Sequence, residues 1–517
     1  MAHNRQEAEE ATDRIQEYRE EGSLKGKAAK GFLWSGLNNS TMQVLNAVFG
    51  IILAQKLNQE DYGLIGMLTI FTLIANSLQD SGFVVSLTNK RDATHADYNS
   101  VFWFNVVVSI TLYVILYTCA PLIAAFFDEP ILTPLSRYYF LGFVIASLSI
   151  VPRALLFRHI RQKELAIMGM VSLLVSGCVG ITMAYCGMAY WGLATQTLVF
   201  NIMVTILSWT MSRWRPSRQV SMRPIREMFG FSSKMLITNI FNQVNNNIFS
   251  ILLGRLYTKV EVGTYTQANK WNTMGSSIIM GMVQGVAQPT FVQVGDDHER
   301  LRRTFSKMLR FTCLVSFPVM FGLSLVAPEF ILVLLPAKWL PSAHLMRILC
   351  IGGAFLPIAT LYFNLIIARG KSDIYMWNVI AQGCAILLST LLIHRFCSPV
   401  TISISWWHHT VSCIDMMVVC YVIIIMSWTF LWHHFLYREI HYPLRSAIKD
   451  IAPFMLISVA TMTATYLITS PISNIHLLLA TRIATAATVY IIIIRCTHVQ
   501  ILQECIKYIW HKKKGKK

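Results

Sequence analysis

The sequence predicts an all-α polytopic membrane protein with about 14 transmembrane helices. More than half of its 517 residues are apolar and 14% are charged, whereas soluble domains carry about 25% charged residues. The apolar residues come in blocks of roughly 20, the length of a helix that crosses a hydrocarbon core of about 30 Å. A transmembrane barrel would need alternating segments of about 10 residues, and the sequence has no such series.

We expect spans at 32–54, 63–87, 99–127, 133–152, 165–187, 189–212, 229–254, 263–291, 306–327, 344–368, 374–396, 400–431, 447–469 and 474–495. They divide the chain into a cytoplasmic leader (1–30), an N-lobe of six helices (31–212), a basic cytoplasmic linker (213–228), a C-lobe of six helices (229–431), two last helices (432–495) and a basic cytoplasmic tail (496–517).

The distribution of basic residues predicts the orientation. About 34 of the 44 lysines and arginines fall at the two termini and in every second loop, and about five fall in the opposite loops. By the positive-inside rule both termini are cytoplasmic. Residues 1–30 are charged throughout and lack the short apolar run of a signal peptide. The net charge of +18 therefore reports topology rather than nucleic-acid binding, and the basic tail is expected to touch anionic lipid headgroups.

The spacing of the cysteines and the lack of a phosphate-binding loop argue against a metal site and an ATP-driven pump. The 11 cysteines are scattered, mostly within apolar segments, and no CxxC pair occurs. Neither a disulfide framework nor a zinc site is indicated, so we predict no metal and no cofactor. The sequence also lacks a GxxxxGK[ST] loop, which argues against a self-contained ATP-driven pump.

An internal repeat relates the two halves. The segment GFLWSGLNNSTMQVLNAVFGIILAQKL (31–57) aligns without a gap with GFSSKMLITNIFNQVNNNIFSILLGRL (230–256), at an offset of 199 residues. Gly63 then matches Gly263 after one inserted residue. Because an even number of spans, six, separates the copies, the repeat is parallel, with its axis along the membrane normal.

Polar side chains follow one face of the first helix in each half. At about 100° per residue, one arc of the later copy holds Lys234, Thr238, Asn239, Asn242, Asn245 and Asn246, and five of their six equivalents are polar: Ser35, Asn39, Ser40, Gln43 and Asn46. The second helices carry similar stripes: Thr69, Thr72, Asn76, Gln79 and Asp80, and Lys270, Thr273, Ser277, Gln284 and Gln288. Any single Asn or Thr could be bonding across packed helices. Four matched stripes with three charges favour the wall of a hydrated central cavity.

Several stretches carry a resemblance to a known family: LNQEDYGLIGMLTIFTLIANSLQDSGF (57–83), SRWRPS (212–217), LGRLYTKVEVGTYTQANKW (253–271) and the segment 299–342. They resemble Wzx-type polysaccharide flippases of the multidrug/oligosaccharidyl-lipid/polysaccharide superfamily, in the colanic-acid-exporter-like branch. The resemblance runs from about residue 25 to 395, and the last 120 residues or so match only in being helical membrane segments.

The resemblance implies two six-helix lobes with two extra C-terminal helices. It also implies a function: moving undecaprenyl-pyrophosphate-linked oligosaccharide from the cytoplasmic to the outer leaflet of the bacterial inner membrane, by alternating access, for surface polysaccharide synthesis. Partners would be the lipid-linked glycan, membrane lipids, a coupling H⁺ or Na⁺, and the polysaccharide polymerase and chain-length machinery.

This substrate suggests roles for the polar stripes. A diphosphate and a sugar chain do not dissolve in hydrocarbon, so cations would offset the diphosphate and amides would replace water around the sugars. Lys234 and Lys270 are the best cations, and Asp80 could pair with one of them. The full candidate set is Lys234, Lys270, Asn39, Gln43, Asn46, Thr238, Asn242, Asn245, Asn76 and Asp80.

Two further groups are weaker candidates. Arg153, Arg158 and Arg161 could collect the diphosphate at the cytoplasmic entrance, although ordinary positive-inside anchoring explains them as well. Asp415, with His408 two turns away in the predicted span 400–431, could bind a coupling ion. A structural, hydrogen-bonded Asp415 is the alternative.

Two rival functions remain. A multidrug or cation antiporter of the same superfamily would keep the fold, but its site should be acidic and aromatic, whereas the embedded charges here lean basic. A membrane glycosyltransferase or polymerase could use Glu60 and Asp61 as an acidic pair. The loop that holds them is only about eight residues long, which leaves no acceptor site, so we predict that the protein is not an enzyme.

Overall fold

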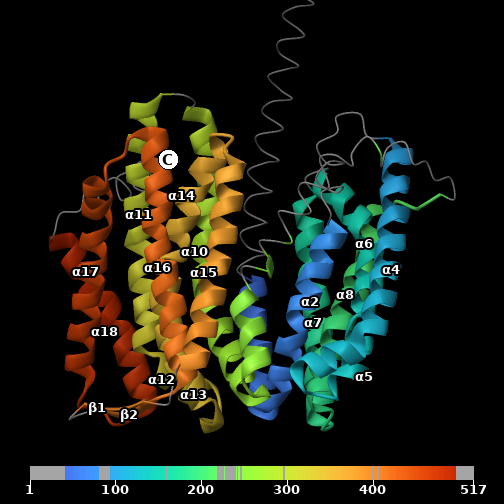
Figure 1. Cartoon of the computed structure of the whole chain (residues 1–517), viewed down its shortest axis with the longest axis horizontal. Helices are drawn as coiled ribbons and strands as arrows, with labels where there is room; N and C mark the ends of the chain where they lie inside the picture. Colours follow the sequence, from blue (N-terminus) through green and yellow to red (C-terminus); the bar gives the residue numbers. More distant parts are fainter. Residues whose placement is uncertain are drawn as a thin grey trace, which may run out of the picture. The chain divides into compact units, whose positions relative to one another are not determined.

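The computed structural model describes residues 41–80, 94–158, 161–217, 247–294, 297–396, 400–404 and 407–496, together with residues 226, 240, 243, 244. Almost all of these residues are helical (Figure 1). The chain forms two compact units. Unit 1 comprises Met1–Leu57 and Phe71–Ile240, and unit 2 comprises Asn58–Ile70 and Phe241–Lys517.

Unit 1 holds five complete helices: α4 (His95–Phe127), α5 (Leu132–Tyr139), α6 (Leu141–Arg158), α7 (Gln162–Tyr185) and α8 (Ala189–Ser212). It also holds helical residues 41–56 and the second half of α2 (Gln59–Asp80). Local signals set the helix ends. Thr94 and Asp97 form a capping box at the start of α4. The φ of 78° at Gly187 lets the chain turn between α7 and α8.

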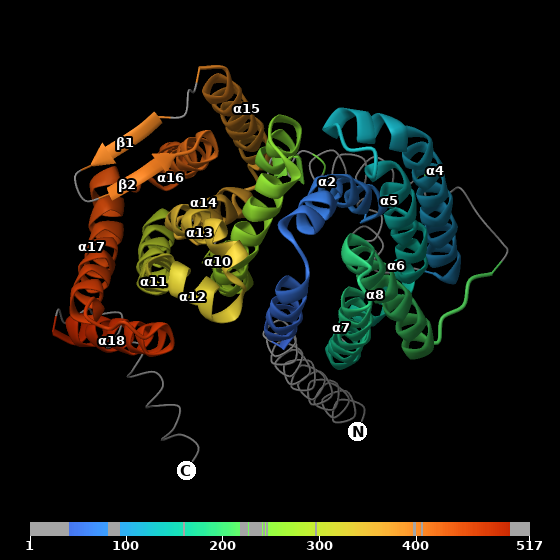
Figure 2. The same cartoon turned by 90° about the horizontal axis from the view of Figure 1, so that it is seen from below.

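Among the described residues, unit 2 contains the helix Asn247–Leu256. It also contains α10 (Lys259–Val294), α11 (His298–Leu325), α12 (Ala327–Leu334), the 3₁₀ turn η1 (Ala337–Trp339), α13 (Leu340–Gly353), α14 (Leu356–Ala368), α15 (Ser372–Phe396), α16 (Cys413–Ile440), α17 (Leu444–Thr469) and α18 (Ile475–Cys496). Seen from below, α13 and α14 lie in the middle of this unit (Figure 2). Pro341 and Pro357 sit in the first turns of α13 and α14, where a missing N–H costs nothing. The break before Pro357 divides the predicted span 344–368 into two helices.

Ten helices in the described part of the chain are long and apolar enough to cross a membrane. The fold class is therefore confirmed, while the number 14 stays a prediction. Several predicted spans match closely: 189–212 is α8, and 447–469 and 474–495 fall within α17 and α18, to within one residue for the second. The division into leader, lobes, linker and tail also stays a prediction.

The predicted span 400–431 is wrong at its start. Residues 400–404 and 407–411 are the antiparallel strands β1 and β2, with Val400 opposite Val411, and α16 begins only at Cys413. The β-branched run VTISI favours a strand over a helix. His408 therefore lies on a strand and not two turns from Asp415 on one helix.

Candidate functional site

Much of the predicted cavity wall lies outside the described residues. The predicted wall residues that the structure does not describe are Asn39, Lys234, Thr238, Asn242 and Asn245. Asn76 and Asp80 are in α2, but the positions of their side chains are not described. The predicted pairing of Asp80 with a lysine therefore stays a prediction. The structure places the side chains of Gln43, Asn46 and Lys270.

Gln43 and Asn46 lie on the helix of residues 41–56 in unit 1. Asn46 is exposed and Gln43 is half-buried within this unit. Phe49, about one turn after Asn46, anchors this helix: its ring occupies the space that a side chain at Gly177 of α7 would need. Asn46 is thus available to solvent or ligand, although Val44 beside it is exposed as well.

Lys270 lies on α10 of unit 2 and is half-buried. Its Nζ is 6.0 Å from the centre of the Trp271 ring, and no carboxylate of the described residues pairs with it. Thr273 and Gln284, from the same predicted stripe, are exposed on α10. The stripe therefore lies on the side of α10 that faces away from the core of unit 2.

Two buried amides of α10 were not predicted. Gln267 is fully buried, and neither polar atom of its amide has a partner among the described residues. Asn272 is buried too, next to Gly353 of α13, where a Cβ would lie only 2.2 Å from its Oδ1. Neither amide belongs to the predicted stripe of Lys270 and Thr273, so both were missed.

The starts of α2 and α10 cross at van der Waals contact, both within unit 2. A Cβ on Gly63 would lie 1.9 Å from the carbonyl oxygen of Lys259, and a Cβ on Gly263 would lie 1.9 Å from that of Gln59. These two glycines are the matched pair of the sequence repeat. Small residues let two helix backbones approach this closely, so the repeat appears in the structure as a two-fold-like crossing.

The crossing carries matching caps. The N–H of Asn58 donates to Asp61 at 2.8 Å, and the N–H of Thr258 donates to Glu261 at 3.0 Å. Each is the reciprocal half of a capping box. Equivalent positions of the two copies therefore start their helices by the same local contact.

Polar contacts join the crossing to η1. Lys338 Nζ donates to Asn58 Oδ1 at 2.9 Å, Gln59 Nε2 donates to the Lys338 carbonyl at 2.7 Å, and Lys259 Nζ is 3.5 Å from Glu60 Oε2. We call the segments 58–66, 258–266 and 337–339 the crossing cluster. Within it Glu60 pairs with a lysine and Asp61 caps α2, so both carboxylates of the supposed transferase pair have structural partners.

The three entrance arginines have different surroundings. Arg153 is exposed on α6, and Arg158 ends that helix, with its side chain outside the described atoms. Arg161 begins α7, where it donates to Glu164 and to the carbonyl oxygen of Met211, both at 3.0 Å. Arg161 thus holds the ends of α7 and α8 together. A role in collecting substrate stays a prediction.

Asp415 is the third residue of α16 and caps that helix. Its Oδ2 accepts the N–H of Ser412 at 3.1 Å, and the Ser412 hydroxyl accepts from the N–H of Ile414. This contact accounts for Asp415 as a structural residue. The side chain of His408 is outside the described atoms, and ion coupling through either residue stays a prediction.

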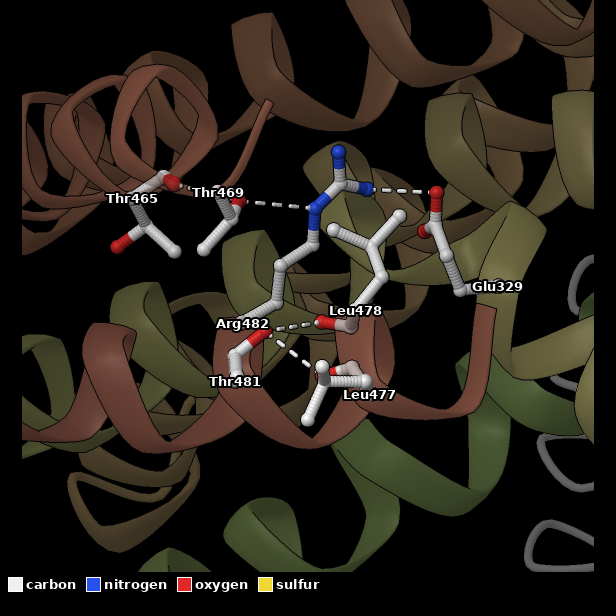
Figure 3. A network of polar contacts seen from close by, with 7 residues as sticks. All are labelled: Glu329, Thr465, Thr469, Leu477, Leu478, Thr481 and Arg482. Carbon is white, nitrogen blue, oxygen red and sulfur yellow. Dashed lines mark hydrogen bonds and ion pairs between the residues drawn. The ribbon is translucent and has the colours of Figure 1, made fainter. Parts of the chain in front are cut away.

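Buried charges in unit 2 went unpredicted. Asp450 of α17 accepts from Arg310 Nε at 2.6 Å and from the hydroxyls of Ser306 and Tyr442. Glu329 of α12 pairs with Arg482 of α18 at 2.6 Å (Figure 3). A charge within an apolar segment was the available signal. The sequence did not show which charges meet, because the partners are between 140 and 153 residues apart.

The fold and the ten long apolar helices of the described residues define a multi-pass, all-α membrane protein. The inward-closed lipid II flippase MurJ superposes with a TM-score of 0.72, covering 89% of this chain and 97% of that one at 14% identity. An inward-facing multidrug transporter of the MATE family, from the MOP superfamily, superposes with a TM-score of 0.61, covering 78% and 98% at 15% identity. At such identities the likeness concerns the fold alone.

Residues 52–344 match the family described as "Polysaccharide biosynthesis protein", and the chain belongs to this family. Three relatives fit that membership. The lipopolysaccharide biosynthesis protein WzxC of Escherichia coli is 23% identical, over 69% of this chain and 73% of its own length. The teichuronic acid biosynthesis protein TuaB of Bacillus subtilis is 25% identical, over 77% and 82%. The succinoglycan biosynthesis transport protein ExoT of Rhizobium meliloti is 21% identical, over 68% and 71%.

Proposed function

We propose that this protein is a flippase that moves undecaprenyl-pyrophosphate-linked oligosaccharide from the cytoplasmic to the outer leaflet of the bacterial inner membrane. The observation that carries the proposal is a combination: the chain belongs to a polysaccharide biosynthesis family, has relatives named for lipopolysaccharide and teichuronic acid biosynthesis, and superposes on a lipid II flippase. The protein would act without covalent chemistry, and both termini would be cytoplasmic, as the basic residues predict.

Lys270 supports this substrate class. Its ammonium lies on the outward side of α10 with no carboxylate partner among the described residues, and exposed Thr273 and Gln284 share that side. A lysine binds phosphate as a point charge, while hydroxyls and amides can exchange hydrogen bonds with sugars. Lys234 would supply a second cation, and Asn39, Gln43, Asn46, Asn76, Thr238, Asn242 and Asn245 the remaining polar wall.

The crossing cluster supports alternating access. By the predicted topology it lies at the outer ends of α2 and α10. Its contacts would close the outer side while the cavity is open to the cytoplasm, and they would part to release the glycan. The start of α2 belongs to unit 2 although the rest of that helix belongs to unit 1, so α2 links any motion of the cluster to both units. A coupling H⁺ or Na⁺ would drive the cycle, and the polymerase would receive the product.

The first experiment is deletion of the gene, followed by extraction of lipid-linked oligosaccharides. We expect the complete lipid-linked repeat unit to accumulate on the cytoplasmic leaflet, where an added membrane-impermeant glycosidase cannot reach it in intact spheroplasts. A plasmid copy should restore export. Normal surface polysaccharide in the deletion strain would contradict the proposal.

A second experiment tests Lys270. K270Q should abolish complementation at normal protein levels in the membrane, and K270R should restore part of it, since Arg keeps the charge with a different geometry. K307Q, which removes an exposed lysine of α11 outside the predicted polar stripes, is the matched control. Full export by K270Q would remove Lys270 from the site.

A multidrug or cation antiporter is the second candidate, because MATE transporters share the fold. The same spheroplasts should then show drug efflux that depends on the protein. We expect no such efflux, because the ammonium of Lys270 on α10 would repel a cationic drug.

A further inference from the structure

In unit 2 the ion pair of Glu329 on α12 and Arg482 on α18 lies within electrostatic range of Arg347, in the middle of α13. Glu329 Oε1 is 2.6 Å from Arg482 Nη1, and both side chains are nearly buried, with 12% and 6% exposed. Arg482 Nε donates to Thr469 Oγ1 at 3.3 Å, and its Cζ lies 5.4 Å from the centre of the Tyr466 ring. Figure 3 shows the guanidinium held between Thr469 on one side and Glu329 on the other. The backbone of α18 is thereby fixed against α12 and α17.

Arg347 of α13 brings the third charge. It is half-buried and lies within electrostatic range of Glu329, Arg482 and Tyr466. Its guanidinium has no hydrogen bond or ion pair among the described residues. Arg482 Nη2 has no such partner either. The cluster thus holds two positive charges and one negative charge, with donors to spare.

The surroundings of the cluster are apolar. Tyr466, Leu467 and Ile468 on α17 and Leu477 on α18 all have at least 50% of their surface exposed, which for a membrane protein means contact with lipid. An uncompensated arginine at such a place is costly. An anion would remove that cost. Arg is suited to a phosphate, because its planar fork of N–H groups matches two phosphate oxygens.

The depth of the cluster indicates which phosphate. Arg482 is seven residues into α18, about 10 Å from its start by helical rise. On the predicted topology, on which this step and the proposed function both rest, that start is at the outer face. The level suits the phosphate of a lipid whose tail remains among the apolar residues of α17 and α18.

We propose that Arg347, beside the Glu329–Arg482 pair, binds the phosphate of a lipid in the outer leaflet. The lipid is either the transported diphosphate after its transfer or a resident anionic phospholipid, since both present the same group. Glu329 competes with this phosphate for the arginines and keeps the site weak enough to release it.

The experiment measures lipid retention by the full-length protein in detergent, by native mass spectrometry, with phosphatidylglycerol and undecaprenyl diphosphate as probes. R347Q should weaken binding of the preferred probe at least about tenfold, and R347K less. R137Q is the matched control: Arg137 of unit 1 is also half-buried, with its Cζ 4.3 Å from the Tyr117 ring. It should bind like wild type. Equal retention by R347Q and R137Q would overturn the proposal.

E329Q separates binding from a purely structural cluster. Loss of the competing carboxylate should tighten phosphate binding, and added anionic lipid should restore the melting temperature that E329Q lowers. Unchanged retention with an unrescued melting temperature would show a structural clasp only and overturn the proposal. The preferred probe identifies the lipid: undecaprenyl diphosphate indicates the transported molecule, and phosphatidylglycerol a resident lipid. If the deletion strain exports polysaccharide normally while R347Q still weakens binding of the phosphate-bearing lipid, the proposed flippase function fails and the lipid site stands.

Discussion

Two regions of unit 2 hold helices together by opposite means. In the crossing cluster the charged contact is open to solvent: Glu60 is 55% exposed and Lys259 31%, with 3.5 Å between their charged atoms. Around Asp450 the contacts are buried: this carboxylate is 3% exposed and accepts from three donors on α11 and the α16–α17 turn.

The difference sets how easily each region can come apart. Exposed ion pairs contribute about 0–1 kcal/mol, because water competes for both charges and salt screens them. The Asp450 contacts are stronger, because a hydrogen bond to a buried charged acceptor contributes about 1.5–3 kcal/mol even though Arg310 itself is 41% exposed. The crossing cluster therefore suits a contact that opens and closes, whereas the Asp450 cluster suits a permanent joint between α11 and α17.

The largest effect is expected from D450N. The substitution removes a charged acceptor shared by Ser306, Tyr442 and the partly exposed Arg310, so the free energy of unfolding should fall by about 3 kcal/mol. The measurement is thermal unfolding of the purified protein in detergent. D297N is the control, because Asn replaces Asp well as the exposed N-cap of α11. A melting temperature equal to that of D297N would show that the buried cluster is not a permanent joint.

The next effect concerns the glycine crossing. In G263A the new methyl would meet the Gln59 carbonyl at 1.9 Å, so the crossing must widen, at a cost of about 1–3 kcal/mol, and export should fall. G281A lies on the same helix with nothing within 4 Å and should be neutral or slightly stabilising. Complementation of the deletion strain and thermal unfolding give both readouts. If G263A behaves like G281A, the close crossing does not matter.

A smaller effect is expected at the caps. T258A removes the hydroxyl that Glu261 accepts from, and should cost about 1 kcal/mol by the usual loss of an N-cap. T258S keeps the hydroxyl and should match wild type. Hydrogen exchange at the first turn of α10 reports the change locally. Identical exchange in T258A and T258S would mean that the cap contributes nothing there.

The smallest effect on stability is expected from K259Q, at most about 1 kcal/mol, because the pair is exposed. Its effect on the transport cycle should be larger than its effect on stability, because the closed form of the crossing cluster is populated less. A cysteine in place of Asn58 should therefore react faster with a water-soluble thiol reagent in K259Q. K307Q, an exposed lysine on α11, is the control. A slower reaction in K259Q would reverse the proposed role of the pair.

Much of this protein follows from local sequence. Apolar length predicts the helices, because a helix that crosses lipid must satisfy its own backbone. The repeat placed Gly63 opposite Gly263 in the alignment before their contact was visible. The basic loops predicted an orientation by a rule that needs no fold.

The tertiary structure decided the partners. Asp415, a candidate for ion coupling, caps its own helix, while Asp450 and Glu329, which the sequence did not single out, hold buried arginine contacts. Residues 400–411 form a hairpin although their apolar character fitted a span. The physical reason is that hydropathy and periodicity indicate which faces of a segment are buried or exposed. The energy of a charged side chain depends instead on the group it contacts in the folded protein. For Asp450 and Glu329 the partner arginine comes from another helix more than 100 residues away.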